Sequence, residues 1–232
     1  MRKAPPLAPT LAQLARQIEQ CERCPRLRAY AAAVCQRRRK AFAAQTYWGK
    51  PVAGFGDPNA RLLLVGLAPA AHGALRTGRM FTGDRSGDFL FAALHRAGFC
   101  NQPVSQHRDD GLRLHDAWLG AAARCAPPGN RPTPAELRRC RPYLERELAL
   151  LPQLRVIISL GGLGHDQLLH ALSAPRPYSR FRFVHGGEYR FERWQLLACY
   201  HPSQQNTFTG RLTPAMMDAV LARARVLVDQ ST

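Results

Sequence analysis

A short apolar run that ends at a glycine constrains the fold of this chain more than any other feature. Leu62–Val65 has the length and apolar character of a buried strand in a parallel sheet. The run ends at Gly66, and the loop that follows carries few reactive side chains until Asp84. In open α/β sheets, ligands bind at loops that follow the carboxyl ends of strands. The sequence therefore predicts a ligand site at this loop.

A single acid in such a loop favours one kind of chemistry. Asp84 follows Gly83 and precedes an expected helix that Ser86 is placed to cap. A site made of backbone groups and one carboxylate suits a reaction that needs positioning and charge stabilisation more than a strong nucleophile.

Strands and helices alternate along the chain. Strands are expected at residues 61–65, 118–123, 155–160 and 195–200, and helices at 10–20, 86–97, 133–151, 162–172 and 213–228. Pro142 should kink or split its helix, and residues 181–191 are expected to form a hairpin that turns at Gly186 and Gly187. Strands separated by helices indicate the α/β class, with a mainly parallel sheet covered by helices on both faces.

Size and hydropathy indicate one soluble unit. With 232 residues, 46% of them hydrophobic, the chain can bury one substantial core. We expect a single domain over residues 1–232, in which residues 1–60 form an N-terminal extension. No apolar run approaches the roughly 18 residues of a membrane span, and the N-terminus lacks a hydrophobic signal core. These features predict a cytoplasmic monomer with no membrane partner.

The charge balance indicates an anionic partner. Lysine and arginine outnumber aspartate and glutamate 33 to 16, which gives a net charge of +17. Only three of the basic residues are lysines, and that skew is typical of GC-rich genomes. Genome bias explains arginine in place of lysine but does not explain the excess over acids. Nucleic acid is therefore the expected partner.

Four of the seven cysteines stand out by their spacing. Cys21 and Cys24 form a C-x2-C followed by proline, and Cys125 and Cys140 form a C-x14-C. Four thiolates suit zinc or a [4Fe-4S] cluster equally well by count, and unrelated buried thiols are the alternative. A disulfide framework is not expected in a cytosolic protein. Cys35, Cys100 and Cys199 are interpreted as packing residues.

A second polar segment follows the last expected strand. His201 stands at the end of this strand, at the sheet edge that also carries the Gly66 loop if the two strands are parallel. The tract that follows contains Phe208 and Arg211, an aromatic side chain and a cation suited to a nucleic-acid groove.

Together these motifs resemble the uracil-DNA glycosylase superfamily, and within it the iron–sulfur family 5, also called type b. The residues that carry the resemblance are Gly66-Leu-Ala-Pro-Ala70, Phe81-Thr-Gly-Asp84, His201-Pro-Ser-x-x-Asn206, Pro51-Val-x-Gly-Phe-Gly-Asp57 and the four spaced cysteines. The related family 4 has glutamate and glycine where this chain has Leu67 and Ala70, and usually asparagine where it has Ala121.

The resemblance implies a fold, a cofactor and an activity. It implies a three-layer α/β/α sandwich around a four-stranded parallel sheet. It also implies a structural [4Fe-4S] cluster ligated by Cys21, Cys24, Cys125 and Cys140, and excision of uracil and often other deaminated bases from DNA.

The resemblance also assigns roles to single residues. Asp84 would orient the attacking water and stabilise the cationic sugar, His201 would donate to the O2 atom of the base, and Asn206 would hold water or phosphate. The base would be contacted by Phe81, by Asn130 and by backbone groups of Gly66, Leu67 and Ala68. No role is assigned to His72.

The basic run Arg37, Arg38 and Arg39, together with Arg211, is expected to contact DNA phosphates. A solvated helix face is the alternative for the run.

Two classes of function remain open. The first is a monofunctional glycosylase associated with the nucleoid, since no lysine lies in the motifs to form a Schiff base. The second is a non-catalytic iron–sulfur module that binds nucleic acid.

Overall fold

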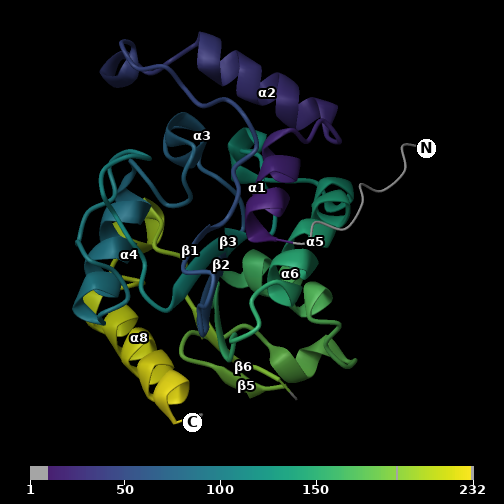
Figure 1. The fold of residues 1–232 in the computed structure, drawn as a ribbon, viewed down its shortest axis with the longest axis vertical. Coiled ribbons are helices and arrows are strands. Elements are labelled where there is room, and N and C mark those ends of the chain that lie inside the picture. Colours follow the sequence, from purple (N-terminus) through teal and green to yellow (C-terminus); the bar gives the residue numbers. More distant parts are fainter. Residues whose placement is uncertain (1–9, 192, 231–232) are drawn as a thin grey trace.

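The computed structural model describes residues 10–191 and 193–230 (Figure 1). Residues 1–9, which carry part of the expectation about a signal segment, lie outside the described residues. No helix of the described part is long and apolar enough to cross a membrane.

The described residues form one six-stranded sheet in the order β1-β3-β2-β4-β6-β5. The four inner strands are parallel to one another, as predicted: β2 (Leu62–Gly66), β3 (Ala117–Ala121), β4 (Val156–Leu160) and β6 (Gln195–Cys199). Two short antiparallel strands lie at the edges. β1 (Phe55–Gly56) was not predicted, and β5 (Glu188–Arg190) falls within the hairpin expected over residues 181–191. Strands of two or three residues are too short to leave a periodic signal in a sequence.

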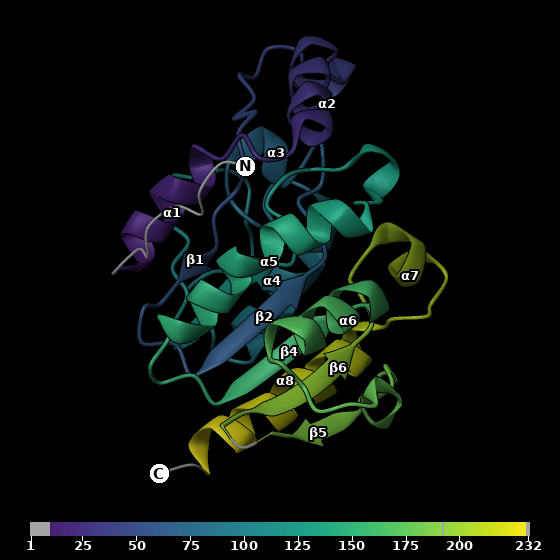
Figure 2. The same cartoon turned by 90° about the vertical axis from the view of Figure 1, so that its right-hand side faces the viewer.

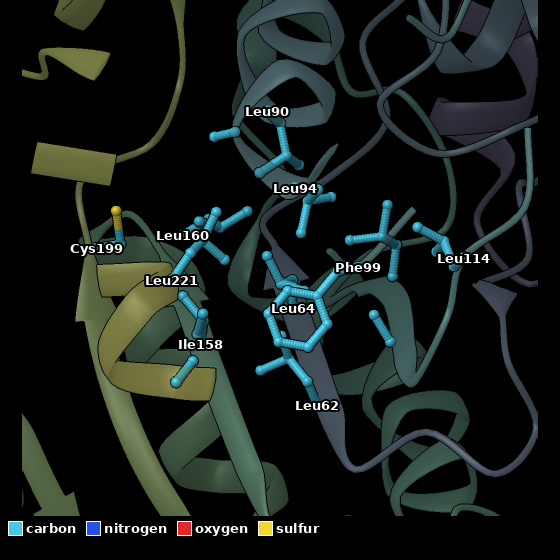
Figure 3. Close-up of a cluster of buried hydrophobic side chains, with 14 of the residues drawn as sticks. Leu62, Leu64, Leu90, Leu94, Phe99, Leu114, Ile158, Leu160, Cys199 and Leu221 are labelled. Carbon is cyan, nitrogen blue, oxygen red and sulfur yellow. The ribbon is translucent and has the colours of Figure 1, made fainter. Parts of the chain in front are cut away.

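Helices cover both faces of the sheet, because successive strand residues point to opposite sides. Leu62 and Leu64 of β2 pack with α4 (Arg85–Arg96) and α8 (Pro214–Asp229), as Figure 3 shows with Leu90, Leu94 and Leu221. Leu63 and Val65 point to the other face, where they pack with α5 (Pro134–Ala149) and α6 (Gly162–Ala171). The three-layer sandwich expected from the sequence is therefore confirmed.

The remaining helices lie at the N-terminus and at one end of the sheet. Leu14 and Ile18 of α1 (Leu11–Glu19) pack against α5. Figure 2 shows α2 (Pro25–Gln36), α3 (Ala74–Thr77) and α7 (Gln204–Phe208) beyond the end of the sheet at which β2 and β6 finish. The structure also has three 3-10 turns, at Lys40–Phe42, Pro128–Asn130 and Tyr178–Phe181.

Three local predictions differ from the structure. Asp84, and not Ser86, is the N-cap of α4, since the helix begins at Arg85 and the Asp84 carboxylate accepts from the Gly87 N–H at 2.9 Å. Pro142 does not split α5; a proline removes only one backbone hydrogen bond, and the residues after it stay packed on the sheet.

The expected hairpin over residues 181–191 is the third difference. The turn exists, since the Gly187 N–H donates to Val184 at 2.9 Å. Gly186 then donates to Ala198 at 2.8 Å, so this backbone pairs with the end of β6 and continues into β5. The residues before the turn form no strand, and β5 pairs with β6 as the edge strand of the sheet.

Candidate active site

The loops after β2, α3 and β6 meet at one edge of the sheet and enclose two connected hollows. The inner pocket has a volume of about 40 Å³. Its lining includes five residues predicted from the sequence: Gly66, Ala68, Phe81, Asp84 and His201. The pocket opens into an outer groove of about 730 Å³, and Asp84, Ala70 and Ser86 line both hollows.

The Asp84 carboxylate is held by its place at the start of α4. One oxygen accepts from Gly87, as an N-cap does, and the other rests against Gly73, where a Cβ atom would lie 1.9 Å from Oδ2. Burial raises the pKa of Asp84 above its usual value, against the lowering effect of the Gly87 and Ser86 N–H groups. The carboxylate is therefore fixed in place and only partly solvated.

Phe81 adopts a left-handed backbone with φ of 51°, which turns its ring over Gly66. A Cβ atom at Gly66 would lie 2.9 Å from the ring, so the contact requires glycine there. The ring also faces His201, with ring centroids 6.0 Å apart and planes inclined by 34°. An aromatic wall and an imidazole thus border the same small space.

His201 enters the pocket as a neutral group. Burial lowers the pKa of its imidazole to about 4, so near pH 7 the ring has one N–H donor and one acceptor. Its backbone is held by Asn206, whose side-chain amide donates to the His201 carbonyl at 2.8 Å. Gly161 allows the close approach of this loop, since a Cβ atom there would lie 3.2 Å from the His201 Cβ.

The other predicted base contacts have different surroundings. The Leu67 carbonyl accepts from the Ala123 N–H at 2.8 Å, and its nitrogen lies beside Gly164, so Leu67 stands outside the pocket lining. Asn130, with φ of 57°, lines the outer groove and not the inner pocket. Asn206 lines neither hollow, and its contact with water or phosphate stays a prediction.

Basic and aromatic side chains border the outer groove. Of the predicted phosphate contacts, Arg39 lines the groove, while Arg38 donates to the backbone carbonyls of Cys35 and Ala43 at 3.1 and 3.2 Å. Arg37 follows the last residue of α2 and is exposed, and the exposed Arg211 guanidinium lies 4.7 Å from the centroid of the Tyr200 ring. The run does not lie on a helix, because α2 ends at Gln36, but all three arginines are exposed and their contact with phosphate stays a prediction.

Sequence reasoning missed several residues of this groove. Tyr30 and Arg85 line it without belonging to any motif noted above, and so does His72. Phe42 lines it as well, and its place directly after the basic run had associated it with the expected phosphate contacts. Phe208 at the end of α7 is 67% exposed, with the Arg85 guanidinium 5.1 Å from its ring centroid.

The four spaced cysteines, Cys21, Cys24, Cys125 and Cys140, line one small cavity at the other end of α2. Cys24 is the residue before α2, Cys140 lies in α5, and the Cys140 sulfur accepts from the Arg124 N–H at 3.3 Å. Burial raises the pKa of the Cys125 and Cys140 thiols to about 12, so a metal group bound there would displace protons.

Among the described residues, no three or more His, Cys, Asp or Glu side chains are arranged to hold a single metal ion. The other cysteines pack as expected: Cys100 and Cys199 are buried in the main core, and Cys35 lies against a smaller cluster.

Comparison with known proteins agrees with this geometry. The model of the family described as "Uracil DNA glycosylase superfamily" matches residues 53–225, a range that contains Asp84 and His201 of the inner pocket. The chain belongs to this superfamily. Relatives separate its branches: a type-5 uracil-DNA glycosylase of Mycobacterium leprae is 51% identical over 95% of this chain and 96% of the relative.

A type-5 enzyme of Thermus thermophilus is also 51% identical, over 89% of this chain and 93% of the relative. A type-4 uracil-DNA glycosylase of Archaeoglobus fulgidus is 31% identical over 66% of this chain and 70% of the relative. The chain therefore belongs to the type-5 family, as the residues Leu67 and Ala70 indicated.

Proposed function

We propose that this chain hydrolyses the N-glycosidic bond of uracil in DNA and leaves an abasic site. The observation that carries the proposal is that Asp84, His201 and Phe81 border one pocket that opens into a groove with basic walls. The pocket is too recessed for a base that stays stacked in a duplex, so the nucleotide must be flipped out of the helix.

Cleavage of the bond places positive charge on the deoxyribose and negative charge on the departing base. The Asp84 carboxylate orients the attacking water and stabilises the sugar cation. Its raised pKa follows from burial, and the same burial strengthens its interaction with a nearby cation. The Gly87 N–H keeps the carboxylate in place at no cost of reorganisation during the reaction.

The neutral His201 imidazole donates its N–H to the O2 atom of the base, where charge develops. A pKa of about 4 keeps the ring uncharged at the pH of the cell, so the donor gains strength only as the base becomes anionic. Asn206 supports this role through the His201 backbone. Phe81 stacks on the base, and the backbone at Gly66 and Ala68 contacts its edge.

Three further features belong to the proposal. None of the described residues that line the pocket or the groove is a lysine, which supports hydrolysis without a Schiff base and hence a monofunctional enzyme. The four alanines in the pocket, Ala68, Ala70, Ala74 and Ala121, present no polar group to reject other deaminated bases. We place the enzyme at the nucleoid, as a monomer acting in base excision repair.

The four cysteine side chains fit a [4Fe-4S] cluster, held by Cys21, Cys24, Cys125 and Cys140. Support comes from the donor set itself: four thiols from three separate segments line one cavity, with the Arg124 N–H directed at the Cys140 sulfur. When bound, the cluster supplies a covalent link between the α1–α2 junction and the β3–α5 segment. It takes no part in the hydrolysis, since its cavity and the inner pocket share no lining residue.

The test uses a labelled duplex with a single uracil, incubated with the protein and then treated with hot alkali. Breakage at the uracil that depends on alkali supports the proposed function, and an all-thymine duplex is the control. Asp84→Asn should lose turnover while it still binds DNA. Absence of breakage with protein that holds iron and binds DNA would refute the proposal and favour the non-catalytic module.

A further inference from the structure

Arg76, on the short helix α3, is a buried arginine whose guanidinium contacts three separate segments. Only 8% of the residue is exposed. Nε donates to the His72 carbonyl at 2.8 Å, and the two terminal nitrogens donate at 2.5 Å each, one to the Gln45 side chain and one to the Gly83 carbonyl. All three nitrogens are therefore used, and Gly83 immediately precedes Asp84.

The same guanidinium also holds the wall of the outer groove. Its carbon lies 4.0 Å from the centroid of the Phe42 ring, a close cation–π contact. Phe42 and Arg39 both line the groove. The segment 39–45 contributes a cation and an aromatic ring to this wall, and Arg76 binds two of its side chains.

Backbone hydrogen bonds extend this attachment. The Trp48 N–H donates to the Arg76 carbonyl at 2.9 Å, and the Gly49 N–H donates to Leu75 at 3.1 Å. The buried Tyr47 hydroxyl lies 2.9 Å from His72 Nδ1. Residues 42–49 are thus joined to α3 and its preceding loop by side chains at one end and by backbone at the other.

We propose that Arg76 is a positioning residue that couples the groove wall formed by residues 39–45 to the Asp84 carboxylate. A phosphate bound at the wall and the sugar at Asp84 belong to the same strand, so a fixed distance between wall and carboxylate places the glycosidic bond. The inference rests on the proposed uracil-excising function.

Arginine is required because the coupling uses its planar shape. Three donors in a fixed fork reach three acceptors, while the flat face covers the Phe42 ring. A lysine supplies the charge but has one nitrogen, so it can satisfy only part of this set. The substitution Arg76→Lys therefore keeps the charge and removes the planar shape.

The charge of Arg76 affects the pH dependence of the rate, which a loss of packing alone would not change. The charged and titratable groups that line the groove with Asp84 are Tyr30, Arg39, His72, Arg85 and Asp88, and His201 shares the inner pocket. Burial and the nearby Asp88 raise the pKa of Asp84, and the charge of Arg76 lowers it. Removal of the Arg76 charge should raise the pKa of Asp84 further, and the acid limb of the rate profile should move to higher pH.

The experiment compares Arg76→Gln, Arg76→Lys and Phe42→Ala with wild type, and Arg96→Gln is the matched control. Arg96 stands at the far end of α4 in an exposed ion pair with Asp218. Single-turnover excision of uracil is measured across pH 4–8 at saturating protein, and affinity is measured with an undamaged duplex of the same sequence.

We expect Arg76→Gln to lower the maximal rate by about tenfold or more, to weaken DNA binding, and to move the acid limb to higher pH. Arg76→Lys should restore the acid limb but neither the rate nor the affinity. Phe42→Ala should weaken binding without moving the acid limb. Arg96→Gln should match wild type.

Two results would overturn the coupling. One is an Arg76→Gln protein that only melts earlier, with an unchanged acid limb and affinity. The other is an Arg76→Lys protein with wild-type rate and affinity. If Arg76→Gln fails to fold, Arg76→Lys and Phe42→Ala still test whether Arg76 couples the groove wall to Asp84. An inactive wild type would instead refute the proposed function, and the affinity measurements would then report on the groove wall by themselves.

Discussion

Gly73→Ala should disable the enzyme without removal of any functional group. The added Cβ atom would lie 1.9 Å from Asp84 Oδ2, 2.7 Å from Cγ and 3.1 Å from Cβ. Since real Cβ contacts essentially never fall below 3.0 Å, the carboxylate must move by about 1 Å or more. The whole side chain faces the new atom, so rotation of the carboxylate alone does not relieve the contact.

A displacement of this size predicts the loss of rate. A misplacement of about 1 Å costs about 100-fold in rate, equivalent to about 2.7 kcal/mol of transition-state stabilisation. The same movement disturbs the hydrogen bond to Gly87 that caps α4, which costs about 1 kcal/mol of folding stability. DNA affinity should change little, because Gly73 borders the groove only beside Asp84.

Single-turnover excision of uracil, thermal melting and duplex binding together test this prediction. Gly162→Ala is the matched control, because a Cβ atom there would meet Phe183 at an ordinary 3.5 Å. A Gly73→Ala enzyme with a rate within about twofold of wild type would show that the position of Asp84 does not limit the chemistry. That outcome would refute the reasoning.

Three further predictions concern protonation and the cysteine cavity. The excision rate should stay level between pH 6 and 8 and fall only on the acid side, because His201, with a pKa of about 4, gains charge there and Asp84 becomes protonated; a pH–rate profile checks this. Asp110 stabilises the fold above about pH 4. Burial alone would raise the pKa of its carboxyl, but hydrogen bonds from Arg79 and backbone N–H groups lower that pKa well below its usual range. The stability that the ionised Asp110 contributes is therefore lost as the pH falls toward the pKa of the folded state. Asp110→Asn should therefore melt earlier than wild type at pH 7 and differ less at pH 3. Cys125→Ser should lose bound iron and sulfide, the visible absorbance and solubility; a colourless wild type loaded with zinc would contradict the cluster.

The sequence predicted those parts of the structure whose cause is local or periodic. Leu62–Val65 is buried on both faces, so its apolar run is continuous and identifies a central strand. Thr133 caps α5 with its partner Glu136, a pattern visible in four residues. The α2 helix was missed because its alanines fall on all sides and give weak contrast between faces, although Leu27, Ala31 and Val34 share its buried side.

The candidate site was predictable as far as its motifs extend. Asp84 and His201 were expected to lie together because parallel strands end at one edge, and Phe81 was added by the family resemblance. All three line one pocket. Arg76 was not found, because an arginine near a basic patch resembles a phosphate contact until its burial is known. The direction of the Asn206 side chain depends on the path of the loop after β6, which no spacing records.

The three glycines beneath the functional side chains also limit how this pocket can change over evolution. Phe81 rests on Gly66, Asp84 on Gly73 and His201 on Gly161, each closer than a Cβ atom ordinarily allows. A larger residue at any of the three glycines would displace Phe81, Asp84 or His201, so we expect these positions to remain glycine. Ala68 and Ala70 line the pocket, already carry a Cβ atom and are partly exposed, so they can be enlarged one at a time, whereas Ala121 is packed in the main core. Base preference can thus diversify at the alanines while the chemistry stays fixed by the glycines.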